Sequence, residues 1–326
     1  MTGNGEFDII RRYFASSTRQ PRRDVWLSIG DDCAITEIKP NRRLAMTTDT
    51  LVEGTHFLPT ISPADLAYKA VAVNLSDLAA MGAEPAWISL ALTMPKIDHQ
   101  WLEQFSQSFF AILDHYNVDL IGGDTTRGLL SLTITAHGLV AKEKILCRHT
   151  AKVGDWIYVS GTLGDSAAGL DLLLNNTPIE NEEQRYLLQR HLRPTPRVLM
   201  GMELAGIANA AIDLSDGLIS DLQHILDRSQ CGAVIELDQL PLSPQLLSQY
   251  SLAQAQQFAL AGGEDYELCF TIAEQQREKM ERTLRYLGVP YQCIGQIRAN
   301  KQLQFMQNNK PVEVAVSHGF DHFSEK

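Results

Sequence analysis

Short acidic turns recur along this chain, and apolar stretches around residues 25–29 and 44–46 each run into one. The five turns are Gly30-Asp31-Asp32, Thr47-Thr48-Asp49-Thr50, Asn74-Leu75-Ser76-Asp77, Gly122-Gly123-Asp124-Thr125-Thr126 and Asp213-Leu214-Ser215-Asp216-Gly217. Small neighbouring residues leave room for a ligand to approach the backbone. Because strands that end in acidic turns can converge at one edge of a sheet, the pattern favours carboxylates gathered around a ligand.

Each turn taken alone has a simpler explanation, because Asp often caps helices and forms turns through its own side chain. Together the turns favour a metal site, since gathered carboxylates repel one another unless a cation holds them. Mg²⁺ prefers oxygen ligands and usually binds together with substrate phosphates. Thr47 and Thr48 would add neutral oxygens. The sequence therefore favours phosphate chemistry with metal ions, and capping is the alternative.

The bulk properties exclude several classes of protein. A length of 326 residues is large for one core and predicts two domains. The net charge of −11 argues against binding to nucleic acid or to anionic membranes. No apolar run approaches the roughly 20 residues that span a bilayer, and no signal peptide is visible. Five scattered cysteines without a CxxC pair disfavour zinc and disulfides, so we expect a cytoplasmic protein.

Apolar periodicity predicts a first domain over residues 1–140 in which strands and helices alternate. Ser62-Pro63 begins a helix that ends at Gly82. Asn74 falls on the apolar stripe of this helix and Asp77 on its edge, so we expect both to meet a metal, a ligand or a neighbouring domain. The remaining elements expected are a helix over residues 98–116 and strands over residues 87–93, 118–121 and 131–140.

A charged segment over residues 141–155 is the expected linker to a second domain over residues 156–326. Strands are expected there over residues 156–160, 234–237 and 267–272. The stretch Gly161-Thr-Leu-Gly-Asp-Ser-Ala-Ala-Gly169 could offer backbone N–H groups to a phosphate, although a tight strand–helix turn is the favoured interpretation. Neither a P-loop nor the protein-kinase motif set is present.

Four further places could contribute to a site but also have ordinary explanations. His56 could be a core or surface histidine, and Arg148 could be a solvated linker charge, although its guanidinium suits phosphate oxygens. Residues 262–267 combine three carboxylates with an aromatic ring and could equally be a solubilising strand edge. The aromatic residues of 319–323 could pack on the body or stack on a ligand ring.

Seven motifs in this order resemble those of the thiamine-monophosphate kinase family, over nearly the whole chain. They are IGDDCA (29–34), TTDTLVEGTHF (47–57), NLSDLAAMGAEP (74–85), IGGDTTRG (121–128), IDLSDGLISDL (212–222), GGEDYEL (262–268) and GFDHF (319–323). The second and third are long and highly specific. The wider superfamily includes aminoimidazole ribonucleotide synthetase and selenophosphate synthetase, which share the fold.

The resemblance implies an aminoimidazole ribonucleotide synthetase-like α/β fold with α+β character and two domains. Its N-terminal sheet would pair with a second copy in a homodimer, forming a barrel with active sites at the interface. A C-terminal α/β domain would cover the nucleotide. The implied ligands are ATP, thiamine monophosphate and several Mg²⁺ ions.

The resemblance also implies a role for particular residues. Magnesium ligands would be Asp31, Thr47, Thr48, Asp49, Asp77, Asp124, Asp213 and Asp216. ATP would contact Gly123, Asp124, Arg148 and Ser215, and the thiamine phosphate would contact His56, Glu264 and Phe320. Position 320 departs from the Trp or Tyr that relatives often carry, which keeps stacking but removes a polar group. Arg127 lies where other members vary and receives no role.

The implied reaction transfers the γ-phosphoryl group of ATP to thiamine monophosphate, the last step of thiamine diphosphate biosynthesis. A phosphate monoester has a second pKa of about 6, so the acceptor is largely dianionic at neutral pH and needs no general base. We therefore assign no catalytic residue beyond the metal and phosphate ligands, and we expect direct transfer without a phosphoenzyme.

Two alternatives carry different expectations. A sibling ATP-dependent synthetase would share the metal loops but differ at the acceptor pocket, and a selenophosphate synthetase would carry a reactive Cys near its N-terminus. No Cys precedes Cys33 here. A non-catalytic nucleotide-binding or thiamine-phosphate-binding protein would be expected to have lost several of the acidic residues.

Overall fold

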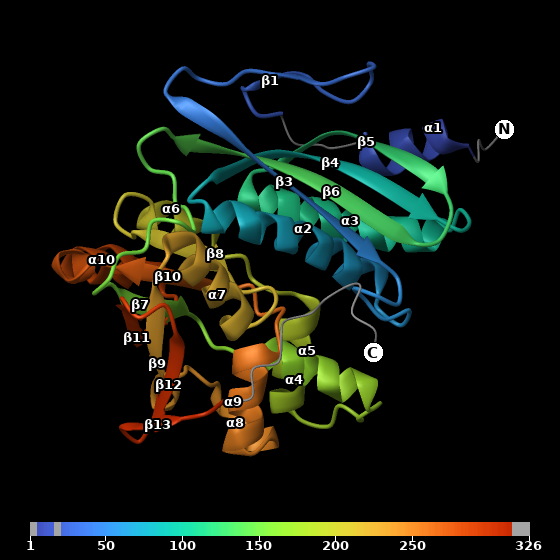
Figure 1. Cartoon of the computed structure of the whole chain (residues 1–326). Coiled ribbons are helices and arrows are strands. Elements are labelled where there is room, and N and C mark those ends of the chain that lie inside the picture. The colour runs from blue at the N-terminus through green and yellow to red at the C-terminus, as the bar shows by residue number, and fades with distance from the viewer. Residues whose placement is uncertain (1–4, 16–20, 315–326) are drawn as a thin grey trace. The chain divides into compact units, whose positions relative to one another are not determined.

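The computed structural model describes residues 5–15 and 21–314 of the chain. The chain divides into two compact units, the first formed by Met1–Leu78 with Ala83–Lys142 and the second by Ala79–Gly82 with Glu143–Lys326. Each unit contains one large sheet with helices packed around it (Figure 1). The expected α/β class with α+β character is confirmed.

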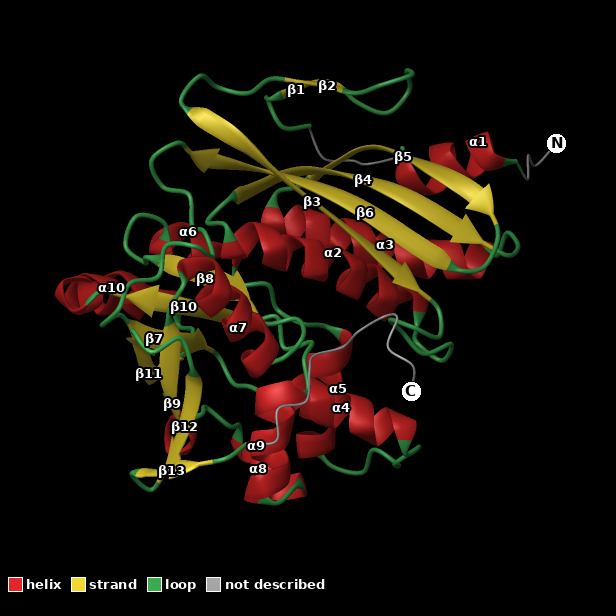
Figure 2. Cartoon of the chain, in the orientation of Figure 1, coloured by secondary structure: helices red, strands yellow, loops and turns green. Residues whose placement is uncertain are grey.

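The first unit is built on a four-stranded sheet in the order β3-β6-β4-β5. Its strands are β3 (Arg42–Val52), β4 (Glu84–Met94), β5 (Asp119–Arg127) and β6 (Ser131–Ala141). β3 and β4 run antiparallel to β6, whereas β4 and β5 are parallel and are joined through a helix. Helices α2 (Pro63–Ala80) and α3 (His99–Tyr116) lie along one face of this sheet, and β1 (Val25–Leu27) with β2 (Ile35–Thr36) lies on the other side (Figure 2). The segments α1 (Glu6–Ile9) and η1 (Ile10–Phe14) precede them.

Local sequence signals explain the helix ends in this unit. Ser62 Oγ accepts a hydrogen bond from the Asp65 backbone N–H, which caps the start of α2 as expected. Asp98 caps α3 through the backbone N–H groups of Gln100 and Trp101, and Asn117 ends it in the left-handed conformation, with φ of 55°. The apolar face of the sheet consists of alternate residues of the two central strands, namely Ile88, Leu90, Leu92, Leu132, Ile134 and Ala136.

Three of the five expected acidic turns are not turns in the structure. Residues 47–50 lie inside β3 and residues 122–126 lie inside β5. Residues 74–77 lie inside α2, which confirms the helix expected from Ser62-Pro63 to Gly82. β3 continues through its acidic stretch because every residue from Arg42 to Val52 is paired in register with β6. Residues 30–32 and 214–217 do lie outside regular strands and helices, as expected.

The second unit is built on a seven-stranded sheet in the order β13-β12-β9-β11-β7-β10-β8. Its strands are β7 (Trp156–Ser160), β8 (Ala210–Asp213), β9 (Gly232–Glu236), β10 (Leu268–Ile272), β11 (Tyr291–Arg298), β12 (Leu303–Gln307) and β13 (Lys310–Val312). Only the β12–β9 pair is parallel among these described strands. The expected strands over residues 156–160, 234–237 and 267–272 are confirmed within two residues at their ends.

Seven α-helices accompany this sheet among the described residues, with three short 3-10 helices, η2 (Leu237–Gln239), η3 (Glu274–Gln276) and η4 (Arg285–Leu287). The α-helices are α4 (Asp165–Leu174), α5 (Glu182–Leu192), α6 (Val198–Leu204), α7 (Leu218–Ser229), α8 (Pro244–Gln249), α9 (Leu252–Ala261) and α10 (Arg277–Leu284). The core under α7 includes Ile212, Leu222, Ile225, Ile235 and Cys269, all buried. In the ranges that the structure describes, no helix is long and apolar enough to cross a membrane.

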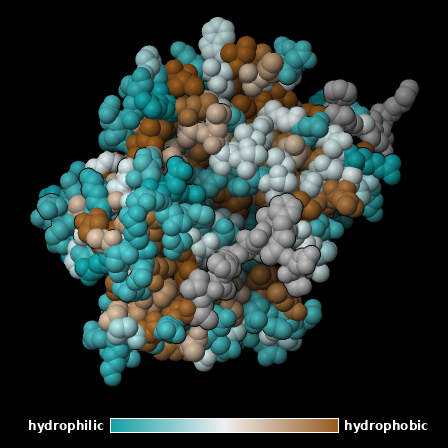
Figure 3. Space-filling model, in the orientation of Figure 1, coloured by the Kyte–Doolittle hydropathy of each residue, from teal (hydrophilic) through white to brown (hydrophobic). Residues whose placement is uncertain are grey.

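Large hydrophobic side chains are exposed in one part of the first unit. Trp26 is 78% exposed, Met46 67% and Ile35 54%. Hydrophobic residues, coloured brown, lie at the surface near the top of Figure 3, where Figure 2 places β1 and β2. Large exposed apolar side chains in one region are a feature of surfaces that another molecule covers.

Candidate active site

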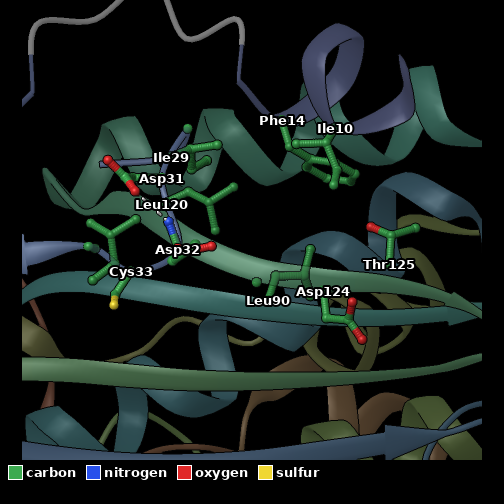
Figure 4. A pocket seen from close by; sticks show the side chains of 15 residues that line it. Ile10, Phe14, Ile29, Asp31, Asp32, Cys33, Leu90, Leu120, Asp124 and Thr125 are labelled. Carbon is green, nitrogen blue, oxygen red and sulfur yellow. Dashed lines mark hydrogen bonds between the residues drawn. The ribbon is translucent and has the colours of Figure 1, made fainter. Parts of the chain in front are cut away.

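A pocket of about 500 Å³ lies beside β5 in the first unit (Figure 4). Its lining comprises Ile10 and Phe14, residues 29–34, Leu90 and residues 120–125. The structure thereby brings together Asp31, Gly123 and Asp124, three residues predicted to bind metal or ATP. Apolar side chains with a few polar groups are the usual lining of a small-molecule site.

Glycine is required at position 123 of this pocket wall. A Cβ atom added to Gly123 would lie 1.9 Å from the Leu90 carbonyl oxygen. The parallel pairing of β4 and β5 also shifts register between Ile88 and Ser89. Gly123 is therefore closed against β4, whereas a Cβ atom added to the neighbouring Gly122 would meet nothing within 4 Å, so a ligand can approach the β5 backbone there.

Three predicted metal ligands meet on the helix-covered face of the sheet. Thr47 Oγ1 donates a hydrogen bond to Asp77 Oδ2 of α2. Burial, and then the negative charge of Asp77, raise the pKa of Asp49 to about 6. Thr47, Asp49 and Asp77 therefore form one group of oxygen ligands whose carboxylates repel each other.

Thr48 does not join that group. Its Oγ1 donates to Thr135 Oγ1 at 3.0 Å, on the open face of the sheet. Successive strand residues point to opposite faces, so Thr48 projects away from Thr47 and Asp49. The pairing of the strands also separates Asp49 from Asp124. Asp124 of β5 pairs with Ala91 of β4, Ala91 pairs with Thr133 of β6, and Thr133 pairs with Thr50 of β3, so Asp124 is in line with Thr50 and not with Asp49.

A second acidic group lies at the end of β8 in the second unit. Asp213 is the last residue of β8 and is 4% exposed, and Ser215 and Asp216 follow it. The Asp216 backbone N–H donates to Asp221 Oδ2 at 3.0 Å. Burial, together with the charges of Asp213 and Asp216, raises the pKa of Asp221 to about 8, against the opposing effects of the Asp216 backbone hydrogen bond and the Arg148 charge. The structure thus brings predicted residues Asp213, Ser215, Asp216 and Arg148 into one neighbourhood.

Asp221 is a member of this group that sequence reasoning did not single out. It lies in the first turn of α7 and is 2% exposed. A signal was available, because Asp221 is the third acid of the IDLSDGLISDL motif. The motif supplied no reason to separate its role from ordinary helix capping.

Residues 262–267 form a turn against the same loop. The Glu264 backbone N–H donates to the Ser215 carbonyl at 2.7 Å, and the Tyr266 N–H donates to the Leu214 carbonyl at 2.9 Å. Glu264 and Tyr266 have φ values of 59° and 50°. Such values are uncommon for non-glycine residues and occur often at ligand-binding positions. The predicted acceptor residue Glu264 is therefore next to the predicted ATP residue Ser215.

The other two carboxylates of this segment are structural. Glu267 is fully buried and accepts hydrogen bonds from Arg190, Arg197 and Ser160. Asp265, 4% exposed, accepts from the backbone N–H groups of Gly164 and Ser166 at 2.7 and 3.2 Å. The solubilising-edge interpretation is therefore wrong for these two residues.

The same contacts decide between the two interpretations of residues 161–169. An internal carboxylate, Asp265, already takes the backbone N–H groups of Gly164 and Ser166 at the start of α4. Gly161 and Gly164 have φ values of 59° and 86°, as a tight strand–helix turn requires. These values support the turn interpretation. The backbone N–H groups of Gly164 and Ser166 are not available to a phosphate, because Asp265 already accepts from them.

The other two predicted acceptor contacts are His56 and Phe320. His56 is half-buried after β3, where its Nδ1 accepts a hydrogen bond from the Val52 backbone N–H at 3.0 Å. Phe320 lies outside the described residues.

The fit of the acidic groups to Mg²⁺ depends on donor chemistry. Within residues 5–15 and 21–314, no set of three or more His, Cys, Asp or Glu is spaced to hold a metal by itself. Mg²⁺ in phosphate-transfer sites usually takes one or two carboxylates, with water and substrate phosphates completing the shell. Asp49 and Asp77 fit that pattern, since both are hard oxygen donors and a cation would relieve their repulsion.

Comparisons with known proteins identify the family. The AIR synthase related protein N-terminal domain matches residues 30–140, and the corresponding C-terminal domain matches residues 152–307. A thiamine-monophosphate kinase of Haemophilus influenzae is 58% identical over 98% of both chains. Among solved structures, thiamine-monophosphate kinase of Stenotrophomonas maltophilia has a TM-score of 0.85 and 42% identity, covering 94% of this chain and 96% of its own. AaThiL complexed with AMPPCP and TMP has a TM-score of 0.78 and 32% identity, covering 98% and 97%. The chain therefore belongs to the thiamine-monophosphate kinases, within the AIR synthase related proteins.

Proposed function

We propose that this chain transfers the γ-phosphoryl group of ATP directly and in line to thiamine monophosphate, forming thiamine diphosphate and ADP. Membership of the kinase family supports the reaction, as does the AaThiL structure complexed with AMPPCP and TMP. The observation in this chain that carries the proposal is the pocket beside β5, which combines Asp31, Gly123 and Asp124. The reaction is the last step of thiamine diphosphate biosynthesis.

ATP binding is assigned to Gly123 and Asp124 of the first unit and to Arg148 and Ser215 of the second. The side-chain-free backbone at Gly122, next to Gly123, would admit phosphate or ribose oxygens to close range. The apolar residues of the same pocket suit the flat face of a purine. Arg148 has the geometry to bind two phosphate oxygens at once.

The acidic residues are assigned to Mg²⁺ ions, which would bridge the phosphates and neutralise the charge that develops during transfer. Thr47, Asp49 and Asp77 supply one set of oxygens, Asp31 and Asp124 a second, and Asp213 and Asp216 a third. Thr48 retains its assignment but faces the same side of the sheet as Asp124. No side chain needs to remove a proton, because the acceptor phosphate is already largely dianionic.

His56, Glu264 and Phe320 are assigned to the thiamine phosphate. Glu264 has the strongest structural support, because its left-handed backbone and its hydrogen bond to Ser215 fix it beside an ATP residue. Its side chain is 29% exposed, which leaves room for contact with a ligand.

The assembly is part of the same proposal. Exposed Trp26, Ile35 and Met46 in the first unit support a homodimer formed through that unit. The interval between the two family domains, residues 141–151, supports a linker within 141–155. All five cysteines carry free thiols, which supports a cytoplasmic location.

Phosphorus NMR of the protein with ATP, Mg²⁺ and thiamine monophosphate tests the reaction. The expected result is a new pair of diphosphate signals from thiamine diphosphate, together with those of ADP. A protein that binds both ligands without producing thiamine diphosphate would overturn the assignment. Retention of configuration at a chiral γ-phosphate would contradict direct transfer.

A further inference from the structure

His191 of α5 lies in a buried ring of contacts in the second unit. It is 5% exposed, and its Nδ1 lies 3.2 Å from Ser166 Oγ and 3.4 Å from Glu264 Oε2. Ser166 in turn donates its backbone N–H to the Asp265 carboxylate at 3.2 Å. The contacts Glu264–His191–Ser166–Asp265 therefore close on themselves, because residues 264 and 265 are adjacent.

The ring surrounds a backbone conformation that needs support. Glu264 has a φ of 59°, and a Cβ atom at the preceding Gly263 would lie 2.6 Å from the Ser215 carbonyl. A left-handed glutamate persists only where its surroundings hold it. Asp265 fixes the main chain on one side, and His191 meets the Glu264 carboxylate on the other.

The position of His191 is set by close helix packing. A Cβ atom at Gly169 of α4 would lie 2.3 Å from the Leu187 carbonyl and 2.9 Å from His191 Cβ. Only glycine lets α5 approach α4 this closely. The imidazole is therefore held by the core of the unit, not by the ligand.

We propose that His191 is a positioning residue that fixes the Glu264 carboxylate before the acceptor binds. The inference rests on the proposed contact between Glu264 and the thiamine phosphate. An imidazole N–H donated to a carboxylate restricts a side chain that otherwise samples many rotamers. The effect should fall on acceptor binding more than on ATP.

Steady-state kinetics of three variants test this. His191→Phe keeps a ring but removes both nitrogens. His191→Asn keeps a hydrogen-bond donor near the position of Nδ1, because the amide nitrogen of Asn is also bonded to Cγ. Leu187→Ala, in the same helix and fully buried, serves as the packing control. We expect His191→Phe to raise the KM for thiamine monophosphate about tenfold and to leave the KM for ATP within about twofold. His191→Asn should restore most of the loss.

Three results would overturn the proposal: an unchanged acceptor KM in His191→Phe, an equal rise in both KM values, or the same acceptor effect in a folded Leu187→Ala. Thermal unfolding confirms that each variant is folded. If His191→Phe does not fold, Ser166→Ala replaces it, with an expected rise of about threefold in the acceptor KM only.

A double-mutant cycle with Glu264→Ala separates this inference from the proposed function. If His191 acts through Glu264, His191→Phe adds nothing in the Glu264→Ala background. Multiplicative effects would overturn the positioning role while leaving the Glu264 assignment in place. A Glu264→Ala variant with an unchanged acceptor KM would overturn both.

Discussion

Two sets of carboxylates in this molecule have opposite surroundings. Glu267 in the second unit is enclosed by Arg190, Arg197 and Ser160, with an Arg190 Nη2–Glu267 Oε1 distance of 2.9 Å. Asp49 in the first unit has Asp77 as its charged neighbour, and no Lys or Arg pairs with it in the part of the chain that the structure describes. The charge of Glu267 is balanced by arginines of the same chain, whereas Asp49 lies beside a second negative charge.

Their pKa values move in opposite directions for this reason. Burial alone would raise the pKa of Glu267, but Arg197, Arg190 and Ser160 outweigh it and the net effect lowers that pKa. Burial, reinforced by Asp77, raises the pKa of Asp49 to about 6. Burial is common to both, so the neighbouring charges distinguish a structural carboxylate from one suited to bind a cation.

The sharpest way to break this contrast is Asp49→Asn. We expect turnover to fall on the order of a thousandfold, because a neutral amide is a far poorer ligand for a cation that offsets phosphate charge. The melting temperature should stay within a few degrees. Rates of thiamine diphosphate formation and a thermal scan of the same sample measure both, and Asp124→Asn should behave alike.

Unfolding of Asp49→Asn would contradict the contrast, because it would place Asp49 among the structural carboxylates. The same conclusion would follow if the variant retained most of its activity.

Glu267→Gln should show the reverse pattern, with stability as the main loss. It leaves Arg190 and Arg197 without their shared carboxylate, and breaking a buried ion pair costs about 3 kcal/mol or more. Denaturant unfolding measures the change. Glu182→Gln is the matched control, since its pair with Arg185 is largely exposed and should cost less than about 1 kcal/mol. Equal losses in the two variants would remove the distinction.

The sequence predicted that acidic residues gather, and part of that holds in each unit. Asp31 and Asp124 line one pocket, and Asp213 and Asp216 both lie close enough to Asp221 to raise its pKa. It did not predict which side of the sheet each residue faces. The run from Thr47 to Thr50 was expected as a turn, whereas its pairing with β6 makes it a strand whose side chains alternate. Alternation depends on a partner strand more than eighty residues away, which no local pattern reveals.

The structural carboxylates were also hidden from the sequence. Asp265 and Glu267 flank Tyr266 in a polar, glycine-led stretch that has the composition of an exposed loop. Their partners come from α5 and from residues 160–166 and 197, so their burial is a product of tertiary packing. Strands β11 to β13 were missed for a similar reason, because strands with a mixed polar and apolar sequence gain stability from the sheet around them.

Binding of Mg²⁺ and nucleotide should stabilise the folded protein, because a cation would offset the repulsion between Asp49 and Asp77. Mg²⁺ with a non-hydrolysable ATP analogue, at about one hundred times its Kd, should stabilise the wild-type fold by about 2.7 kcal/mol. Differential scanning calorimetry with and without the ligands measures the shift. Asp49→Asn should lose most of the gain, and retention of the full gain would mean that ligand binding does not involve Asp49.

The smallest expected effect is a pH dependence of the ligand-free protein. The folded pKa of Asp49, about 6, lies above its ordinary value of 3.8, so the folded state binds more protons than the unfolded state between these values. The contribution of Asp49 to the free energy of unfolding therefore decreases as the pH rises from about 4 to about 6. Asp49→Asn should gain stability over wild type on the order of 1 kcal/mol at pH 8, after allowance for solvent screening, and almost nothing at pH 4. Urea unfolding of wild type and of Asp49→Asn at both pH values measures this difference. The titration of Asp221 and Asp265 cancels in the comparison, because both proteins contain these residues. Asp77→Asn should narrow the pH range over which the two proteins differ, since it removes the negative charge that is the second cause of the raised Asp49 pKa. A pH-independent difference would mean that the charge of Asp49 is already balanced within the chain, as that of Glu267 is.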